Sequence, residues 1–331
     1  MRRTLGVLRL AALAVASLVA LGMPLPAQAA PSRPNVIAPV GSVQAVLLSP
    51  GRHVRSNPGH RSAPLLTKDP NALRVAKAKA QAATTSPSGT TSTATVAPHS
   101  AAIFNGLNSP GLSAADQGYQ PTPPDSTGAV GPNHYLELVN NLVGVYAKTN
   151  LSQLSSTDLA TFTAVPSGLY TSDPQIQWDP LGNRWFYGAV AFNGNFTNNY
   201  LLFGWSKTAD PSDLSGSWCR FGAFTGNQLA DYPKLGHDDN FVLFAANLYD
   251  DTTGNFVFST AAIWALPKPA AGSTTCSASG FTAFADPSHP LLNADGTSAF
   301  TPIPANLSDA SSLGYIVAGH SPLAPKPSDP T

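Results

Sequence analysis

The sequence predicts an all-β protein between residues 101 and 321. Short runs of β-branched and aromatic residues alternate there with turns rich in Asn, Asp, Gly and Pro. None of these runs keeps a 3.6-residue period long enough for a substantial helix. After residue 100 the acidic residues are Asp except for Glu137, and Asp is favoured where a short side chain must bond to its own backbone in a turn. These observations indicate many short strands joined by turns.

Residues 1–29 have the pattern of an export signal. Arg2 and Arg3 precede the apolar run LAALAVASLVALG, and Ala27-Gln28-Ala29 forms a small-x-small cleavage site. The apolar run is shorter than the roughly 20 residues needed to cross a bilayer. We therefore expect cleavage and a secreted protein, extracellular or periplasmic, with no membrane span; an uncleaved anchor is the alternative.

Residues 30–100 are predicted to be a disordered leader. The segment is rich in Pro, Ser, Thr and Ala and has few large apolar groups to offset the entropy of ordering. A short helix is expected near residues 70–82, with Asp69 as N-cap and Pro70 in the first turn. The leader carries eight Lys or Arg against one acid, so it could tether the protein to an anionic cell envelope; a plain spacer is the alternative. Residues 322–331 form a Pro-rich tail.

The segment from residue 101 onward is acidic. It holds seven basic residues against seventeen acidic ones, a net charge of −10. Binding to nucleic acid needs clustered cations to neutralise phosphates. Nucleic acid is therefore not expected as a partner.

Cys219 and Cys276 are the two cysteines of the chain. Neither has the paired spacing of a zinc site, and an exported protein folds in an oxidising compartment. We predict a disulfide between them, which on the loop-entropy model contributes about 4 kcal/mol. Two free buried thiols are the alternative.

Four stretches repeat the same outline of a short extended run, a polar turn and an aromatic-led strand. Three of them begin at Asp125, Asp173 and Asp231, spaced 48 and 58 residues apart, and a fourth begins at Phe300 without the leading Asp. Small meanders at this spacing are typical of β-propeller blades rather than of a sandwich. The expected fold is propeller-like, with about three and a half blades, which implies a truncated chain or one that a partner closes.

The repeats also carry a resemblance to a known group. The segments DSTGAVGPNHYLELVN, SDPQIQWDPLGNRWF, WSKTADPSDLSGSW and DYPKLGHDDNFVLFAAN resemble those of exported bacterial proteins of largely unassigned function that are expected to be β-propellers. The resemblance covers roughly Gln120 to Leu266. It implies a fold and supplies no catalytic residues.

The three leading aspartates are the main candidate site. The first strand of each propeller blade lines the central channel, so Asp125, Asp173 and Asp231 could meet there and bind a polar ligand or a structural Ca²⁺. Apart from this calcium no cofactor is expected. The alternative is that each carboxylate caps the turn that enters its blade.

Arg184 and Trp185 form a second candidate. The guanidinium could bind a carboxylate ligand beside the indole ring. The alternative is structural: the arginine stem packs across the ring, and the head pairs with Asp173 or Asp179. No catalytic residue is predicted, because the chain lacks the G-x-S-x-G, H-E-x-x-H and phosphate-loop motifs.

The sequence favours an exported binding or scaffolding module that holds a glycan or a component of the cell envelope. The rival hypothesis is an exo-acting glycoside hydrolase of sialidase-like architecture, with Asp173 or Asp231 as its acid and missing blades completing its site. SDLSGSW, residues 212–218, is similar to the Asp-box turn of sialidases, although its Gly lies three residues after Asp213 instead of two. Arg184 and Arg220 are the only arginines after residue 100, so few guanidinium groups could bind the carboxylate of an acidic sugar.

Overall fold

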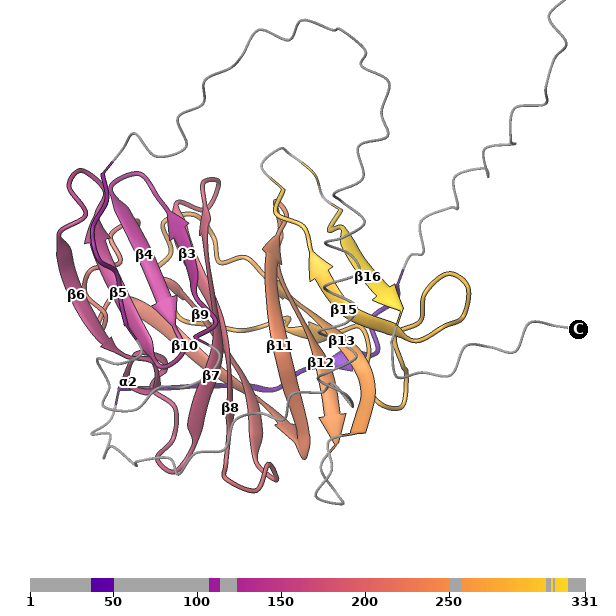
Figure 1. Cartoon of the computed structure of the whole chain (residues 1–331). Coiled ribbons are helices and arrows are strands. Elements are labelled where there is room, and N and C mark those ends of the chain that lie inside the picture. Colours follow the sequence, from indigo (N-terminus) through magenta and orange to yellow (C-terminus); the bar gives the residue numbers. More distant parts are fainter. Residues whose placement is uncertain are drawn as a thin grey trace, which may run out of the picture. The chain divides into compact units, whose positions relative to one another are not determined.

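The computed structural model describes residues 37–50, 107–113, 124–250, 257–307, 311 and 313–320 (Figure 1). The described residues form antiparallel sheets and one short helix, so the predicted all-β class is confirmed. The export signal, the expected helix at residues 70–82 and the Pro-rich tail lie outside them. Among the described residues no helix is long and apolar enough to cross a bilayer.

Each sheet is a meander in which strands consecutive in sequence pair antiparallel. The first sheet contains β3 (Thr127–Val130), β4 (His134–Val139), β5 (Leu142–Ala147) and β6 (Gln153–Asp158). The second contains β7 (Tyr170–Asp179), β8 (Arg184–Phe192), β9 (Asn199–Ser206) and β10 (Trp218–Gly226). The third contains β11 (Gln228–His237), β12 (Phe241–Asp250), β13 (Val257–Pro267) and β14 (Thr282–Ala283). A final pair contains β15 (Ala299–Pro304) and β16 (Ile316–His320).

Apolar clusters join each sheet to the next along the chain. One cluster packs β4 and β5 against β7 and β8, a second packs β8, β9 and β10 against β11, β12 and β13, and a smaller one joins β12 and β13 to β15. The inner strands are buried on both faces, as in β12, where every residue from Val242 to Tyr249 is buried. This explains why their sequences read as continuous apolar runs instead of alternating ones.

The first strands of consecutive sheets contact one another. β3 lies against β7, β7 against β11, and β11 against β15. Between the first and second sheets the chain forms α2 (Leu159–Thr163), which Asp158 caps by accepting from the Thr161 backbone N–H at 2.7 Å. Phe162 of α2 packs edge-on against Trp218, with ring centroids 4.9 Å apart.

The predicted disordered leader is wrong for residues 37–50. Within this stretch β1 (Gly41–Ser42) pairs with β14 and β2 (Ala45–Leu47) pairs with β10, so two sheets gain a fifth strand. The stretch has no charged residue, and its Val and Ala side chains suit a pleated edge. It orders because free sheet edges supply the backbone partners that its composition alone cannot provide.

The predicted disulfide is confirmed. Cys219 lies on β10 and is bonded to Cys276, which lies between β13 and β14. The bond therefore links the second sheet to the third. The β1 and β2 strands cross the same junction, so two separate connections hold these sheets together at their outer edges.

Candidate binding site at the start of the first strands

The repeat is defined in the structure by backbone conformation and not by aspartate. Asp125, Asp173, Tyr232 and Thr301 occupy the same place in four consecutive sheets, and all four have a positive φ, between 42° and 54°. In β7, β11 and β15 this residue begins a bulge in the pairing with the next strand. The predicted equivalence of Asp231 with Asp173 is therefore wrong by one residue, because the counterpart of Asp173 is Tyr232.

Side-chain oxygens connect these bulges from one sheet to the next. The Asp173 N–H donates to Asn140 Oδ1 at 2.8 Å, the Tyr232 N–H to Asp173 Oδ2 at 3.3 Å, and the Thr301 N–H to Asn247 Oδ1 at 2.8 Å. The sequence interpretation missed Asn140 and Asn247. The available signal was the Asn that ends the apolar stretch of the second strand in two of the repeats, LELVN and LFAAN.

We expect Asn247→Ala to lower the free energy of unfolding by about 2 kcal/mol. Asn247 is 2% exposed and makes two bonds to Thr301, since its Nδ2 also donates to Thr301 Oγ1 at 2.9 Å. Urea unfolding of the variant measures the loss. Asn227→Ala is the matched control, because Asn227 makes an exposed bond to Asp250 at 3.2 Å and its removal should change stability little. Equal values for the two variants would contradict this role for Asn247.

The three predicted aspartates do lie together, with Lys234 beside them. Asn140 Nδ2 donates to Asp125 Oδ2 at 2.6 Å, and the Asp125 and Asp173 carboxyls share a hydrogen bond. Burial, followed by the charge of Asp173, raises the pKa of Asp231 to about 7 and the pKa of Asp125 to about 6. Burial also lowers the pKa of Lys234, although all three carboxylates oppose that change. Two of the three acids therefore change protonation near neutral pH.

Tyr232 is the most exposed aromatic residue of this cluster. Its side chain is 52% exposed, and the Lys234 ammonium lies 3.1 Å from the centre of its ring. One face of the ring is therefore engaged by a cation. The cluster brings carboxylate acceptors, an ammonium donor and an aromatic edge together from three sheets. This combination suits a polar ligand.

The calcium hypothesis remains a prediction. Among the described residues no three His, Cys, Asp or Glu side chains are grouped closely enough to hold a metal ion. The Lys234 ammonium already interacts with the carboxylates of Asp125, Asp173 and Asp231. A bound cation would have to compete with that ammonium.

Arg184 and Trp185 lie elsewhere and have internal partners. Arg184 is 2% exposed and donates to the main-chain carbonyls of Ala270 and Ser273 at 3.1 and 3.3 Å. Trp185 is fully buried, donates to the Ala209 carbonyl at 3.1 Å and packs against Trp178. The ligand-binding hypothesis for this pair does not fit such burial, whereas the structural alternative does.

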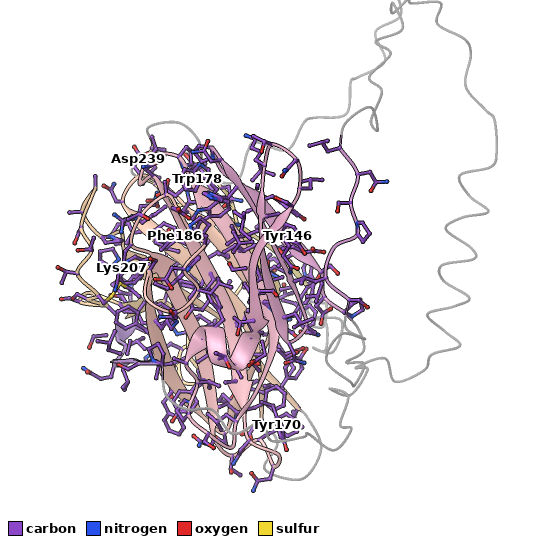
Figure 2. The ribbon with its side chains drawn as sticks, turned by 90° about the vertical axis from the view of Figure 1, so that its left-hand side faces the viewer. Tyr146, Tyr170, Trp178, Phe186, Lys207 and Asp239 are labelled. Carbon is purple, nitrogen blue, oxygen red and sulfur yellow. A yellow bond between two sulfur atoms is a disulfide. The ribbon has the colours of Figure 1, made fainter. Side chains whose placement is uncertain are left out.

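The pair also lies at the opposite end of β7 from the acidic cluster. Figure 2 shows Tyr170, where β7 begins, at one end of the molecule and Trp178, near the end of β7, at the other. Asp173 is close to the Tyr170 end, while Arg184 pairs with Asp179 across the β7 and β8 ladder. The two predicted groups therefore do not form one site.

The features that suggested a sialidase have structural roles. Asp213 is exposed and accepts from the backbone N–H groups of Ser215 and Gly216 at 3.0 and 2.9 Å, which lowers its pKa to about 2. Arg220 is 2% exposed and donates to the carbonyls of Phe162, Trp218 and Leu214. With Arg184 also buried, both arginines that follow residue 100 are engaged inside the fold.

No family model matches the chain, and no curated protein is significantly similar to it.

Proposed function

We propose that the protein is an exported β-propeller-type binding module whose ligand contacts the acidic end of the first strands. The observation that carries the proposal is the cluster of Asp125, Asp173, Asp231 and Lys234 beside the exposed ring of Tyr232. Three meanders and a final strand pair in chain order, with their first strands in contact, support the propeller architecture. The disulfide and the signal-like N-terminus support export.

The chemistry of the cluster favours a glycan of neutral or amino sugars. Carboxylates accept hydrogen bonds from sugar hydroxyls, an ammonium group of an amino sugar would be attracted to them, and an aromatic edge packs on sugar C–H groups. An acidic sugar would meet three carboxylates in a domain with a net charge of −10, with Arg184 and Arg220 both buried. The geometry therefore favours polysaccharides without carboxylate or sulfate groups.

A glycan array probed with the purified full-length protein tests this proposal. We expect binding to neutral or amino-sugar polysaccharides, weakened at least tenfold by Asp173→Asn and by Tyr232→Ala. Tyr315→Ala is the matched control, because Tyr315 is similarly exposed, 54% against 52%, and bonds through its carbonyl to Ala305 near the other end of β15. Absence of binding across the array, or equal loss with Tyr315→Ala, contradicts the proposal.

A second candidate function is glycoside hydrolysis with Asp231 as general acid. The observation that favours it is the pKa of Asp231, about 7, next to the Asp173 carboxylate. A carboxylic acid that stays protonated near neutral pH, beside a second carboxylate, is the arrangement that glycosidases use to protonate a leaving group. This candidate requires turnover in addition to binding.

Turnover of the array-positive glycan separates the two functions. If the protein is a hydrolase, Asp231→Asn should abolish release of reducing sugar while it leaves glycan binding within about threefold of the wild type. If the protein is a binding module, the wild type releases no sugar above a heat-denatured sample.

A further inference from the structure

Residues 37–50, called the strap below, lie across the outer edges of the second and third sheets. β1 pairs with β14, and β2 pairs with β10. Between and beyond these short strands, the N–H groups of Val43 and Leu48 donate to the carbonyls of Phe281 and Arg220 at 2.8 and 2.9 Å. The strap thus adds an extended strand to two sheets. Extended peptides bind exposed sheet edges in the same way, through main-chain hydrogen bonds.

Over residues 43–46 the side chains of the strap alternate between the fold and the solvent, and after the exposed Leu47 the side chain of Leu48 faces the fold again. Val43 and Ala45, like Cys276 and Ala278, pack against the core cluster of the second and third sheets, and the Leu48 side chain lies beside Gly222. Val46 points outward and is 62% exposed. At positions 43 and 45 the edge therefore receives small apolar side chains in addition to its backbone bonds, so side chains as well as the backbone contribute to recognition.

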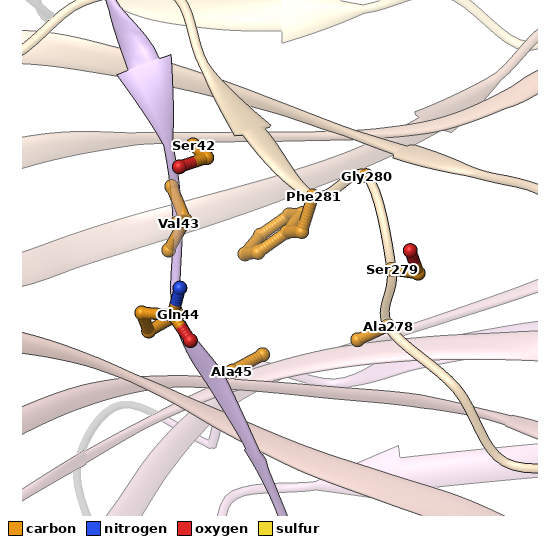
Figure 3. Close-up of a pocket in the computed structure, with 8 residues that line it drawn as sticks. All are labelled: Ser42, Val43, Gln44, Ala45, Ala278, Ser279, Gly280 and Phe281. Atoms are coloured by element: carbon orange, nitrogen blue, oxygen red, sulfur yellow. The ribbon is translucent and has the colours of Figure 1, made fainter.

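The strap lies on the surface and is not threaded through the fold. None of its residues is buried. Figure 3 shows Ala45 and Ala278 facing each other across a pocket of about 310 Å³ between the strap and the segment 278–281, with the Phe281 ring pointing toward the strap. The strap can therefore leave its groove without displacing another described element.

We propose that this groove, formed by residues 220–223 of β10 and residues 278–283, is an acceptor site. It binds either the strap of its own chain or, in its place, the strap of a second copy. Exchange of an identical element between copies needs no new surface, since both partners reuse the same contacts. The proposal is independent of the acidic cluster and of its ligand.

Two features of the chain favour a second copy as the partner. The strap is joined to the rest of the fold through residues 51–106, and a segment of that length can span well over 100 Å when extended, which is enough to reach the groove of a second copy. Those residues carry seven Lys or Arg and one Asp, whereas the segment from residue 101 has a net charge of −10. This charge complementarity attracts the N-terminal region of one copy to the folded region of another.

Retention of one copy by another tests the exchange. In the full-length chain, Val43→Asp with Ala45→Asp removes the strap from its own groove and leaves the groove free. We expect this immobilised double variant to retain the wild-type chain at least tenfold more than it retains a second double variant, which has no competent strap to donate. Equal retention of the two, with the double variant shown to be folded by near-ultraviolet circular dichroism, overturns the proposal.

A measurement on the unsubstituted strap covers the case in which the double variant does not fold. A specific protease site inserted near residue 90 of the full-length chain allows the connection to be cut after folding. We expect the strap fragment to co-elute with the remainder and to be displaced by excess labelled peptide of residues 37–50, but not by the same peptide with Val43→Asp and Ala45→Asp. The exchange is contradicted if the fragment separates from the remainder and the labelled peptide does not bind. It is also contradicted if the fragment stays bound and no peptide displaces it.

Discussion

Asp179→Asn should lower the free energy of unfolding by about 3 to 5 kcal/mol, which corresponds to a fall in Tm of about 10 °C for a domain of this size. Asp179 is fully buried, and its Oδ2 lies 2.8 Å from the Nζ of Lys268, whose side chain is only 9% exposed. Arg184, also buried, interacts with the same carboxylate. Removal of the negative charge leaves two buried cations without their counterion.

The asparagine substitution isolates this charge effect. Asn keeps nearly the same volume and can still accept from the Leu181 N–H, which bonds to Asp179 Oδ1 at 3.1 Å. The neighbouring imidazole of His237 does not add a further cation at neutral pH, since burial lowers its pKa. The expected loss is therefore electrostatic and is measured by thermal and urea unfolding at pH 7.

Two further variants control the Asp179 prediction. Asp210→Asn removes an exposed carboxylate that lies 3.6 Å from His134 and should cost less than about 1 kcal/mol. Adding Lys268→Met to Asp179→Asn should recover at least half of the lost stability, because the unpaired ammonium is then removed. If the double variant is no more stable than Asp179→Asn alone, the ion pair is not the source of the effect.

Sequence patterns predicted the sheets well, because strands buried on both faces must be continuous apolar runs. The run from Val242 to Tyr249 and the polar turns that follow residues 131, 179 and 237 were visible without coordinates. The disulfide was predictable for a different reason: a chain with two cysteines has one way to pair them. These are local or compositional properties, which a single sequence carries.

The strap could not be predicted from its own composition. Residues 37–50 lack the bulk to form a core, and their order depends on partners at residues 220–223 and 278–283, far along the chain. Likewise, the match between Asp173 and Tyr232 depends on a positive φ, which neither residue type indicates from the sequence. Aligning the repeats on their aspartates therefore placed Asp231, instead of Tyr232, opposite Asp173.

The candidate site was predictable in its members but not in its chemistry. Asp125, Asp173 and Asp231 were expected together, and they are, even though Asp231 reaches the cluster from the position before the bulge. Lys234 and the two bridging asparagines were not anticipated, because each also contacts a residue at the start of another sheet. Burial, which the sequence does not report, raises the pKa of Asp125 and of Asp231.

Asp231→Asn should stabilise the protein at pH 8 by a few kcal/mol and leave its stability at pH 4 nearly unchanged. Asp231 has a pKa of about 7 in the folded state against 3.8 in the unfolded chain, so the folded state holds this proton more tightly. Stability from this group is complete below pH 4, falls as pH rises from about 4 to 7, and is constant above that range. A difference of about three pKa units corresponds to about 4 kcal/mol.

The measurement is the free energy of unfolding of both proteins at pH 4, 6 and 8. Asp125 contributes a slope of the same sign in both proteins, since its pKa is also raised, so the difference between them reports Asp231 together with its interaction with Asp125. Asp213→Asn serves as control: its carboxylate has a pKa lowered to about 2, and the stability it contributes is lost only as pH falls below 4. It should therefore show no change in slope between pH 4 and 8. If Asp231→Asn follows the wild-type pH dependence, the buried acid is ionised with an ordinary pKa. The general-acid candidate then loses its support. The binding proposal still stands, because it also rests on Asp173 and Tyr232.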